Sequence, residues 1–197
     1  MGRRPLAVAI TGGIAAGKSE ALAAFARRGA AVSSADETVH RVYREDESLK
    51  SELRERWGEA VFAADGEVDR AAVAAIVFAD RSELSWLEGV LHPRVRRMHD
   101  RWFDEVAARP DTPTLAVVEI PLLYETGADA AYDKVVALTA ARSVREERRG
   151  VFADREARLI PDEEKLQRAD FAYVNDGSLA ELDAFVDSVV EELTSSL

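Results

Sequence analysis

The residues whose types and spacing best suggest chemistry lie near the start of the chain, at Gly12–Ser19 (GGIAAGKS). A glycine, four residues and then Gly-Lys-Ser is the pattern of a tight loop whose backbone N–H groups wrap around phosphate oxygens. In this pattern the lysine, Lys18, reaches the β- and γ-phosphates of a nucleotide, and the hydroxyl of Ser19 can bind Mg²⁺. The apolar run before the loop and the helical pattern after it provide the context that the motif requires. The loop therefore predicts ATP phosphate binding. The nucleotide contacts expected in and beside it are Gly12, Gly13, Ile14, Ala15, Ala16, Gly17, Lys18, Ser19 and Glu20.

Two carboxylates follow apolar runs that we interpret as strands. Asp36 comes shortly after a strand expected at 30–32, which places it at the same sheet edge as the loop. A carboxylate there can accept the proton of an attacking hydroxyl, although an aspartate in this position can also cap the helix that follows. Glu119 ends a second apolar run and could hold water on Mg²⁺, or it could be a partly buried group bonded to backbone.

The elements that must position these residues alternate between strand and helix patterns. We expect strands at 6–11, 30–32, 114–123, 134–138 and 171–174. We expect helices at 18–28, 37–43, 49–57, 70–79, 84–107, 161–169 and 179–193. This alternation predicts an α/β, three-layer fold with a mainly parallel five-stranded sheet, which binds its ligands at the carboxyl ends of the strands.

The helical block at 37–110 is too long for a simple crossover, so we interpret it as an insertion within a single domain at 1–197 that forms one wall of a cleft. Its longest helix is expected to be interrupted at His92-Pro93, because proline removes a backbone donor and restricts the preceding residue. His92 and Arg96 could be structural at such a break, or they could bind a substrate phosphate.

A cationic segment follows the fourth expected strand. Its arginines are Arg142, Arg145, Arg148, Arg149, Arg155 and Arg158. They could be solvated helix faces or partners of nearby glutamates at a spacing of four residues. They could also belong to a lid at 141–160 that closes over the transferred phosphoryl group.

Composition excludes several other classes of function. The chain has 197 residues and a formal net charge of −11, with 37 acidic and 26 basic residues. This charge argues against binding to nucleic acid or to an anionic membrane. There is no cysteine, which rules out disulfides and thiolate metal sites. The apolar run at 6–10 is too short for a signal peptide or a membrane span, so we expect a cytoplasmic protein. Nothing in the sequence predicts an oligomeric state.

Several motifs, taken in order, resemble those of dephospho-CoA kinases. They are AITGGIAAGKS (9–19), SSAD (33–36), LHPRVR (91–96), EIPLLYE (119–125) and EEKLQRADFAYVNDGS (163–178). The resemblance extends from about residue 6 to about residue 190. It implies a P-loop kinase that transfers the γ-phosphate of ATP, with Mg²⁺, to the 3′-hydroxyl of dephospho-CoA. The products would be CoA and ADP, in the last step of coenzyme A synthesis.

The resemblance also implies roles for individual residues. Asp36 corresponds to the proposed catalytic base, and the helical insertion to the part that holds the CoA moiety. The substrate contacts implied in this way are Asp36, His92, Arg96, Leu122 and Glu125. Arg148 falls in the segment that matches the lid, and Asn175 in a turn that matches a loop beside the adenine. The metal site would use Ser19 and Glu119.

The chain also departs from the usual family pattern. Ala15 and Glu20 replace a glycine and a threonine of the phosphate loop, Ser34 replaces an aspartate, and Leu159 replaces a glutamine. The lid is also shorter. Two alternatives therefore stand beside the first hypothesis: a P-loop kinase of another small acceptor, such as a nucleoside or nucleotide, and an ATP-binding protein with weakened catalysis.

Overall fold

The computed structural model describes residues 4–149 and 159–195, and of Arg149 only the backbone. The chain divides into two compact units. The first comprises the residues up to Ser34 and those from Phe103 onward, and the second is Ala35–Trp102. Each unit has its own core and is described separately below.

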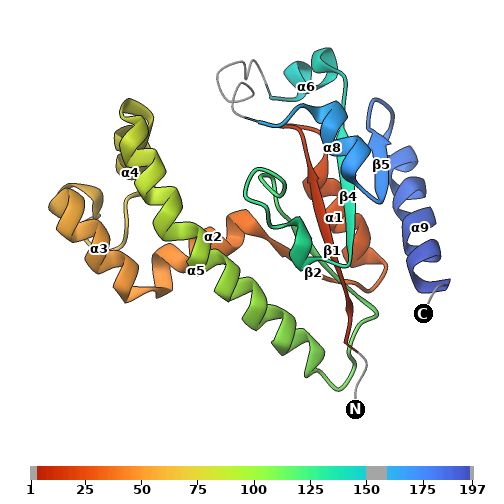
Figure 1. Ribbon diagram of the computed structural model, residues 1–197, viewed down its shortest axis with the longest axis horizontal. Helices are drawn as coiled ribbons and strands as arrows, with labels where there is room; N and C mark the ends of the chain where they lie inside the picture. The colour runs from red at the N-terminus through yellow and green to blue at the C-terminus, as the bar shows by residue number, and fades with distance from the viewer. Residues whose placement is uncertain (1–3, 150–158, 196–197) are drawn as a thin grey trace. The chain divides into compact units, whose positions relative to one another are not determined.

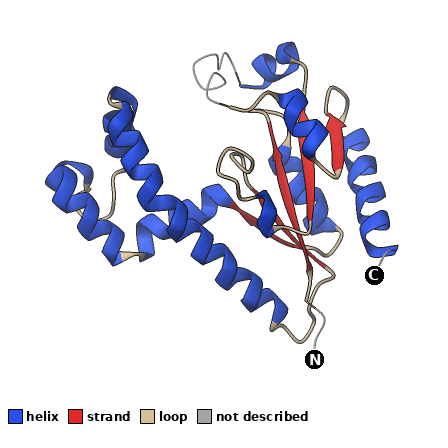
Figure 2. Ribbon diagram, viewed as in Figure 1, coloured by secondary structure: helices blue, strands red, loops and turns tan. Residues whose placement is uncertain are grey.

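The first unit is built on a five-stranded sheet (Figures 1 and 2). Its strands are β1 (Leu6–Gly12), β2 (Ala31–Ser34), β3 (Leu115–Glu119), β4 (Lys134–Thr139) and β5 (Phe171–Val174). Their order in the sheet is β2-β3-β1-β4-β5, and every neighbouring pair is parallel. The expected five-stranded parallel sheet is therefore confirmed. β3 is shorter than the run expected at 114–123, because Pro121 has no N–H with which to extend the ladder.

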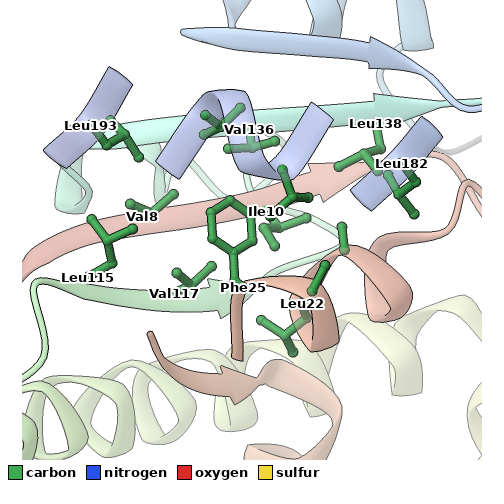
Figure 3. Close-up of a cluster of buried hydrophobic side chains, with 14 of the residues drawn as sticks. Val8, Ile10, Leu22, Phe25, Leu115, Val117, Val136, Leu138, Leu182 and Leu193 are labelled. Atoms are coloured by element: carbon green, nitrogen blue, oxygen red, sulfur yellow. The ribbon is translucent and has the colours of Figure 1, made fainter. Parts of the chain in front are cut away.

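One face of the sheet is covered by α1 (Lys18–Arg27) and α9 (Leu179–Ser195). Alternate residues of the strands, such as Val8 and Ile10, point to this face and pack on Phe25 of α1 (Figure 3). Phe25 is fully buried, so replacing it with alanine would cost about 3–5 kcal/mol of stability. This packing fixes α1, and with it the loop that joins α1 to β1.

The opposite face of the sheet carries α8 (Asp162–Arg168), which contacts β1, β4 and β5. Ala9 and Val135 point to this face and pack with Leu123 and Tyr124 from the segment after β3. That segment contains a short turn of 3₁₀ helix, η2 (Asp129–Ala131). Helix α6 (Arg142–Arg149) follows β4. The three-layer α/β arrangement is thus confirmed.

The second unit is helical. It contains α2 (Ala35–Glu45), α3 (Glu47–Trp57), η1 (Gly58–Val61), α4 (Arg70–Ala79) and the part of α5 (Arg81–Ala107) up to Trp102. Its core gathers one buried face from each of the four α-helices, for example Val42, Leu53, Val77 and Leu87. None of the helices in the described part of the chain is both long and apolar enough to cross a membrane.

The expected interruption at His92-Pro93 is wrong, since α5 continues through Pro93. The proline removes one helical hydrogen bond, which costs about 3 kcal/mol in a helix interior. Leu87 precedes Pro93, Met98 follows it, and both are buried in the core of the second unit. Packing on both sides of the proline thus stabilises the continuous helix against this local cost.

Candidate active site

The phosphate loop begins at Gly12, which is in register with Leu138 of β4. Gly12 has φ +137°, and a Cβ on it would lie 1.8 Å from the carbonyl oxygen of Leu138. Only glycine fits such a position. The next residue, Gly13, donates its N–H to the same oxygen at 3.2 Å. The start of the loop is therefore held against the end of β4.

The other end of the loop is held by Asn175, which follows β5. Asn175 is buried and donates from Nδ2 to the carbonyl of Ala16 at 2.9 Å. A Cβ on Gly17 would lie 2.2 Å from that Nδ2, and Gly17 also has φ +92°. The third glycine of the motif thus makes room for the side chain that anchors the loop. Because the C=O and N–H of a trans peptide point in opposite directions, this bond also aims the N–H of Gly17 away from Asn175.

Arg148 of α6 makes the third anchor. It donates to the carbonyl of Ala15 at 3.3 Å and to that of Asn175 at 3.1 Å. Ala15 has φ +58°, and no other non-glycine residue in the described ranges has a positive φ. Such a conformation costs an alanine about 1 kcal/mol or more. Arg148 and Asn175, both expected at the nucleotide, therefore contact the outer carbonyls of the loop. Arg155 and Arg158 lie outside the described residues.

The two residues expected to bind Mg²⁺ lie together. Ser19, in the first turn of α1, donates from Oγ to Oε2 of Glu119 at 3.2 Å. Glu119 ends β3, whose backbone is in register with Ile10 of β1. Hydroxyl and carboxylate oxygens are ligands that Mg²⁺ accepts, and the ion usually completes its shell with phosphate and water oxygens. Within the described ranges, no group of three or more His, Cys, Asp or Glu side chains could hold a metal by itself.

Lys18 is largely buried at the centre of the loop. Its Nζ donates to the carbonyl of Gly13 at 2.8 Å and to that of Gly12 at 3.3 Å. The ammonium group therefore lies inside the loop, where the motif places it for phosphate binding. Of the other expected contacts, Ile14 is half-buried in the loop and Glu20 is exposed in the first turn of α1.

A pocket of about 200 Å³ lies beside Gly13. Its lining residues are Gly13, Arg145, Leu159, Ile160, Pro161, Asp162 and Glu163. Oδ2 of Asp162 accepts a hydrogen bond from Oγ1 of Thr139 at 2.7 Å and lies 3.7 Å from Nη2 of Arg145. Arg145 belongs to the cationic segment already noted in the sequence, whereas Asp162 and Thr139 were not among the expected site residues. Two features of the sequence could have indicated them: Asp162 is an acid directly after Pro161, which starts an expected helix, and Thr139 follows the end of a predicted strand.

Glu125 and Leu122 lie in the segment after β3. Glu125 forms an ion pair at 2.6 Å with Lys165, whose side chain is 1% exposed. It also accepts the backbone N–H of Ile160 at 3.1 Å. Glu125 thus holds α8 and one wall of the pocket. Leu122 is half-buried, and its carbonyl accepts a bond from Oγ1 of Thr126 at 2.8 Å.

The remaining expected site residues belong to the second unit. Asp36 is exposed and lies inside the first turn of α2, so its interpretation as the cap before this helix is wrong. The reason is that β2 passes directly into α2, which begins at Ala35. His92 and Arg96 are exposed and one turn apart on α5, so they share a face of that helix.

A parallel sheet with a GxxxxGKS loop between its central strand and the following helix defines a P-loop protein, and the sequence comparisons identify a kinase family within this class. The family model for dephospho-CoA kinase matches residues 6–181. The chain therefore belongs to the dephospho-CoA kinase family.

Individual relatives agree with the family model. The dephospho-CoA kinase of Mesorhizobium japonicum is 36% identical, covering 95% of this chain and 96% of the relative. That of Aquifex aeolicus is 33% identical, covering 95% and 97%. Among solved structures, a protein from Thermus thermophilus superposes with a TM-score of 0.79 at 33% identity, covering 97% of this chain and 99% of that one. The dephospho-CoA kinase from Campylobacter jejuni has the same fold, with a TM-score of 0.73 at 24% identity, covering 97% and 98%.

Proposed function

We propose that this protein transfers the γ-phosphate of ATP to the 3′-hydroxyl of dephospho-CoA, giving CoA and ADP. The observation that carries the proposal is the family match over residues 6–181, which includes an anchored phosphate loop. Both ends of this loop are fixed by residues outside it, at β4 and at the turn after β5. A loop that is ordered before binding loses little entropy when it accepts phosphate.

For the ATP site, we propose that the backbone N–H groups at 13–19 and the ammonium of Lys18 bind the phosphates. Lys18 would exchange its bonds to the loop carbonyls for bonds to phosphate oxygens, because a charged acceptor gives the stronger hydrogen bond. Arg148 and Asn175 would orient the loop through their hydrogen bonds to its carbonyls. The turn after Asn175 would lie beside the adenine.

We propose that Mg²⁺ binds beside Ser19 and Glu119, where it would neutralise charge on the β- and γ-phosphates. Ser19 would be its direct protein ligand. Glu119 would hold a water molecule of its coordination shell, since its carboxylate already lies within hydrogen-bond distance of the Ser19 hydroxyl. Both residues would thus keep the transferring phosphate fixed relative to the loop.

For the acceptor, we propose that the second unit holds the CoA moiety, with His92 and Arg96 facing its phosphates. The carboxylate of Asp36 would take the proton of the 3′-hydroxyl as the hydroxyl oxygen bonds to the γ-phosphorus and the bond to ADP breaks. In the first unit, Leu122 and Glu125 would support the substrate side of the pocket. The segment 141–160 would close over the phosphates.

The acceptor can be tested by measuring ADP release from Mg²⁺-ATP with a panel of acceptors. We expect release with dephospho-CoA and little with adenosine, AMP or a simple alcohol. Comparable turnover with one of the other acceptors would favour a different small-molecule kinase. ATP binding without turnover of any acceptor would favour an ATP-binding protein with weakened catalysis.

The role of Asp36 has its own test. An Asp36→Asn variant keeps the shape of the side chain but loses the base, so we expect kcat to fall by about 100-fold or more with ATP affinity unchanged. The matched control is Glu37→Gln, which removes an exposed acid from the same turn of α2. We expect kcat of the control to stay within about twofold of wild type, in the range typical of small surface effects. If Asp36→Asn turned over at the wild-type rate, Asp36 would not be the base.

A further inference from the structure

Arg145 and Asp162 form an ion pair against the phosphate loop. Nη2 of Arg145 lies 3.7 Å from Oδ2 of Asp162, and the two side chains are 11% and 19% exposed. A Cβ built on Gly13 would lie 2.8 Å from Oδ2 of Asp162 and 3.1 Å from Nη1 of Arg145. Both charged groups therefore touch the loop at a position where the motif binds phosphate.

The two partners differ in how firmly they are held. Asp162 accepts a 2.7 Å hydrogen bond from Thr139, a largely buried residue at the end of β4. It also follows Pro161, whose ring restricts the backbone. Its carboxylate is thus fixed to the end of the sheet. Arg145 reaches it from α6 through a long side chain with several rotatable bonds, so the guanidinium is the partner that can move.

A fixed carboxylate at this place affects any anion that enters the loop. Two effects are conceivable: direct repulsion of the phosphate at short range, and competition with the phosphate for Arg145. The first turn of α8 has two further acids, Glu163 and Glu164, which already complement the helix dipole. Helix stability alone therefore gives no reason for an acid at Asp162 in contact with Arg145.

We propose that Asp162 is a positioning residue that holds Arg145 beside the loop until ATP binds, and that ATP binding transfers Arg145 from Asp162 to a phosphate oxygen. This inference rests on the proposed function in requiring ATP in the loop. Asp162 would then lower the affinity for ATP, because the ion pair must open before Arg145 can bind phosphate. It would also keep the guanidinium at the place where it is needed.

The test is the Kd of Mg²⁺-ATP, measured by titration calorimetry on the full chain without an acceptor. The variant Asp162→Asn keeps an oxygen for Thr139 but loses the charge, and we expect its Kd to fall about 3- to 10-fold. The matched control is Glu164→Gln. It removes the same charge from the same turn, where Glu164 makes a surface pair with Arg168 at 3.5 Å. We expect the Kd of the control to stay within about twofold of wild type.

A double variant separates competition from simple repulsion. In an Arg145→Gln background, we expect Asp162→Asn to change the Kd for ATP by less than about twofold, because Asp162 no longer holds a guanidinium that ATP must take over. If Asp162 only repelled phosphate, Asp162→Asn would raise the ATP affinity in that background by at least as much as it does in the wild-type background, and this result would overturn the proposal. An unchanged or higher Kd for Asp162→Asn by itself would also overturn it. If the Asp162→Asn substitution unfolds the protein, Asp162→Ser, which keeps a hydroxyl near Thr139, serves as the second variant.

These outcomes are distinguishable from failure of the proposed function. If wild-type protein did not bind ATP, the nucleotide assignment itself would be wrong. If ATP bound but dephospho-CoA was not phosphorylated, only the acceptor assignment would fail, and the Kd comparison would still decide the role of Asp162.

Discussion

At the scale of single residues, the phosphate loop combines required glycines with one residue under strain. Gly12 and Gly17 adopt conformations and close contacts that exclude a side chain. Ala15 adopts positive φ although it has a Cβ, and it takes the place of a glycine in the family pattern. Its carbonyl is bound by Arg148, so the strain lies at an anchored point of the loop.

This strain predicts that Ala15→Gly stabilises the protein. Glycine adopts φ near +58° without a Cβ clash, and the gain exceeds the entropy that glycine adds to the unfolded chain. We expect the free energy of unfolding to rise by about 0.5–1 kcal/mol, measured by urea denaturation. The control is Ala16→Gly at the neighbouring buried position, where φ is not positive, and which should destabilise. Destabilisation by Ala15→Gly would show that the conformation at Ala15 is not strained.

At the scale of elements, α2 and α5 of the second unit meet through a buried polar pair. Nε2 of His99 and Oγ1 of Thr38 are 3.0 Å apart, and both residues are buried. Burial lowers the pKa of His99 to about 4, from an ordinary value of 6.5. The nearby carboxylate of Asp100 acts in the opposite direction but is the smaller effect. The imidazole is therefore neutral in the folded unit at neutral pH.

The lowered pKa makes the stability of the second unit depend on pH. Between pH 6.5 and 4 the unfolded chain binds a proton at His99 that the folded unit does not bind, so stability is lost as pH falls. The loss amounts to about 3 kcal/mol over this window. The variant His99→Gln keeps a hydrogen-bond partner for Thr38 but has no titrating group at this position. Over the same pH window its free energy of unfolding should therefore fall less than that of wild type, by the contribution of His99.

This pH dependence can be followed through tryptophan fluorescence, because all three tryptophans, Trp57, Trp86 and Trp102, lie in the second unit. Urea unfolding of wild type and His99→Gln would be compared at pH 7 and pH 4.5. Carboxylates titrate in both proteins, so the difference between them isolates His99. Equal losses in the two proteins would contradict the account.

At the scale of the whole molecule, the features that could be predicted from the sequence are those that depend on local spacing. The loop at 12–19 requires glycines at fixed positions, and the strands alternate with helices, so the fold class and the place of the loop between a strand and a helix were both predictable. Side-chain partners distant in sequence were not. The pair Arg145–Asp162 and the buried pair Glu125–Lys165 depend on where α6 and α8 lie in the folded first unit. The rule for proline failed at Pro93, because packing across the second unit outweighs a local cost.

The central claim is that the chain phosphorylates the 3′-hydroxyl of dephospho-CoA. The most direct test is to incubate the protein with Mg²⁺-ATP labelled in its γ-phosphate and dephospho-CoA, and to locate the label in the product. The account predicts labelled CoA with the phosphate on the 3′-oxygen, formed in amounts equal to ADP. Label released only as inorganic phosphate, or found on another acceptor while dephospho-CoA stays unmodified, would contradict it.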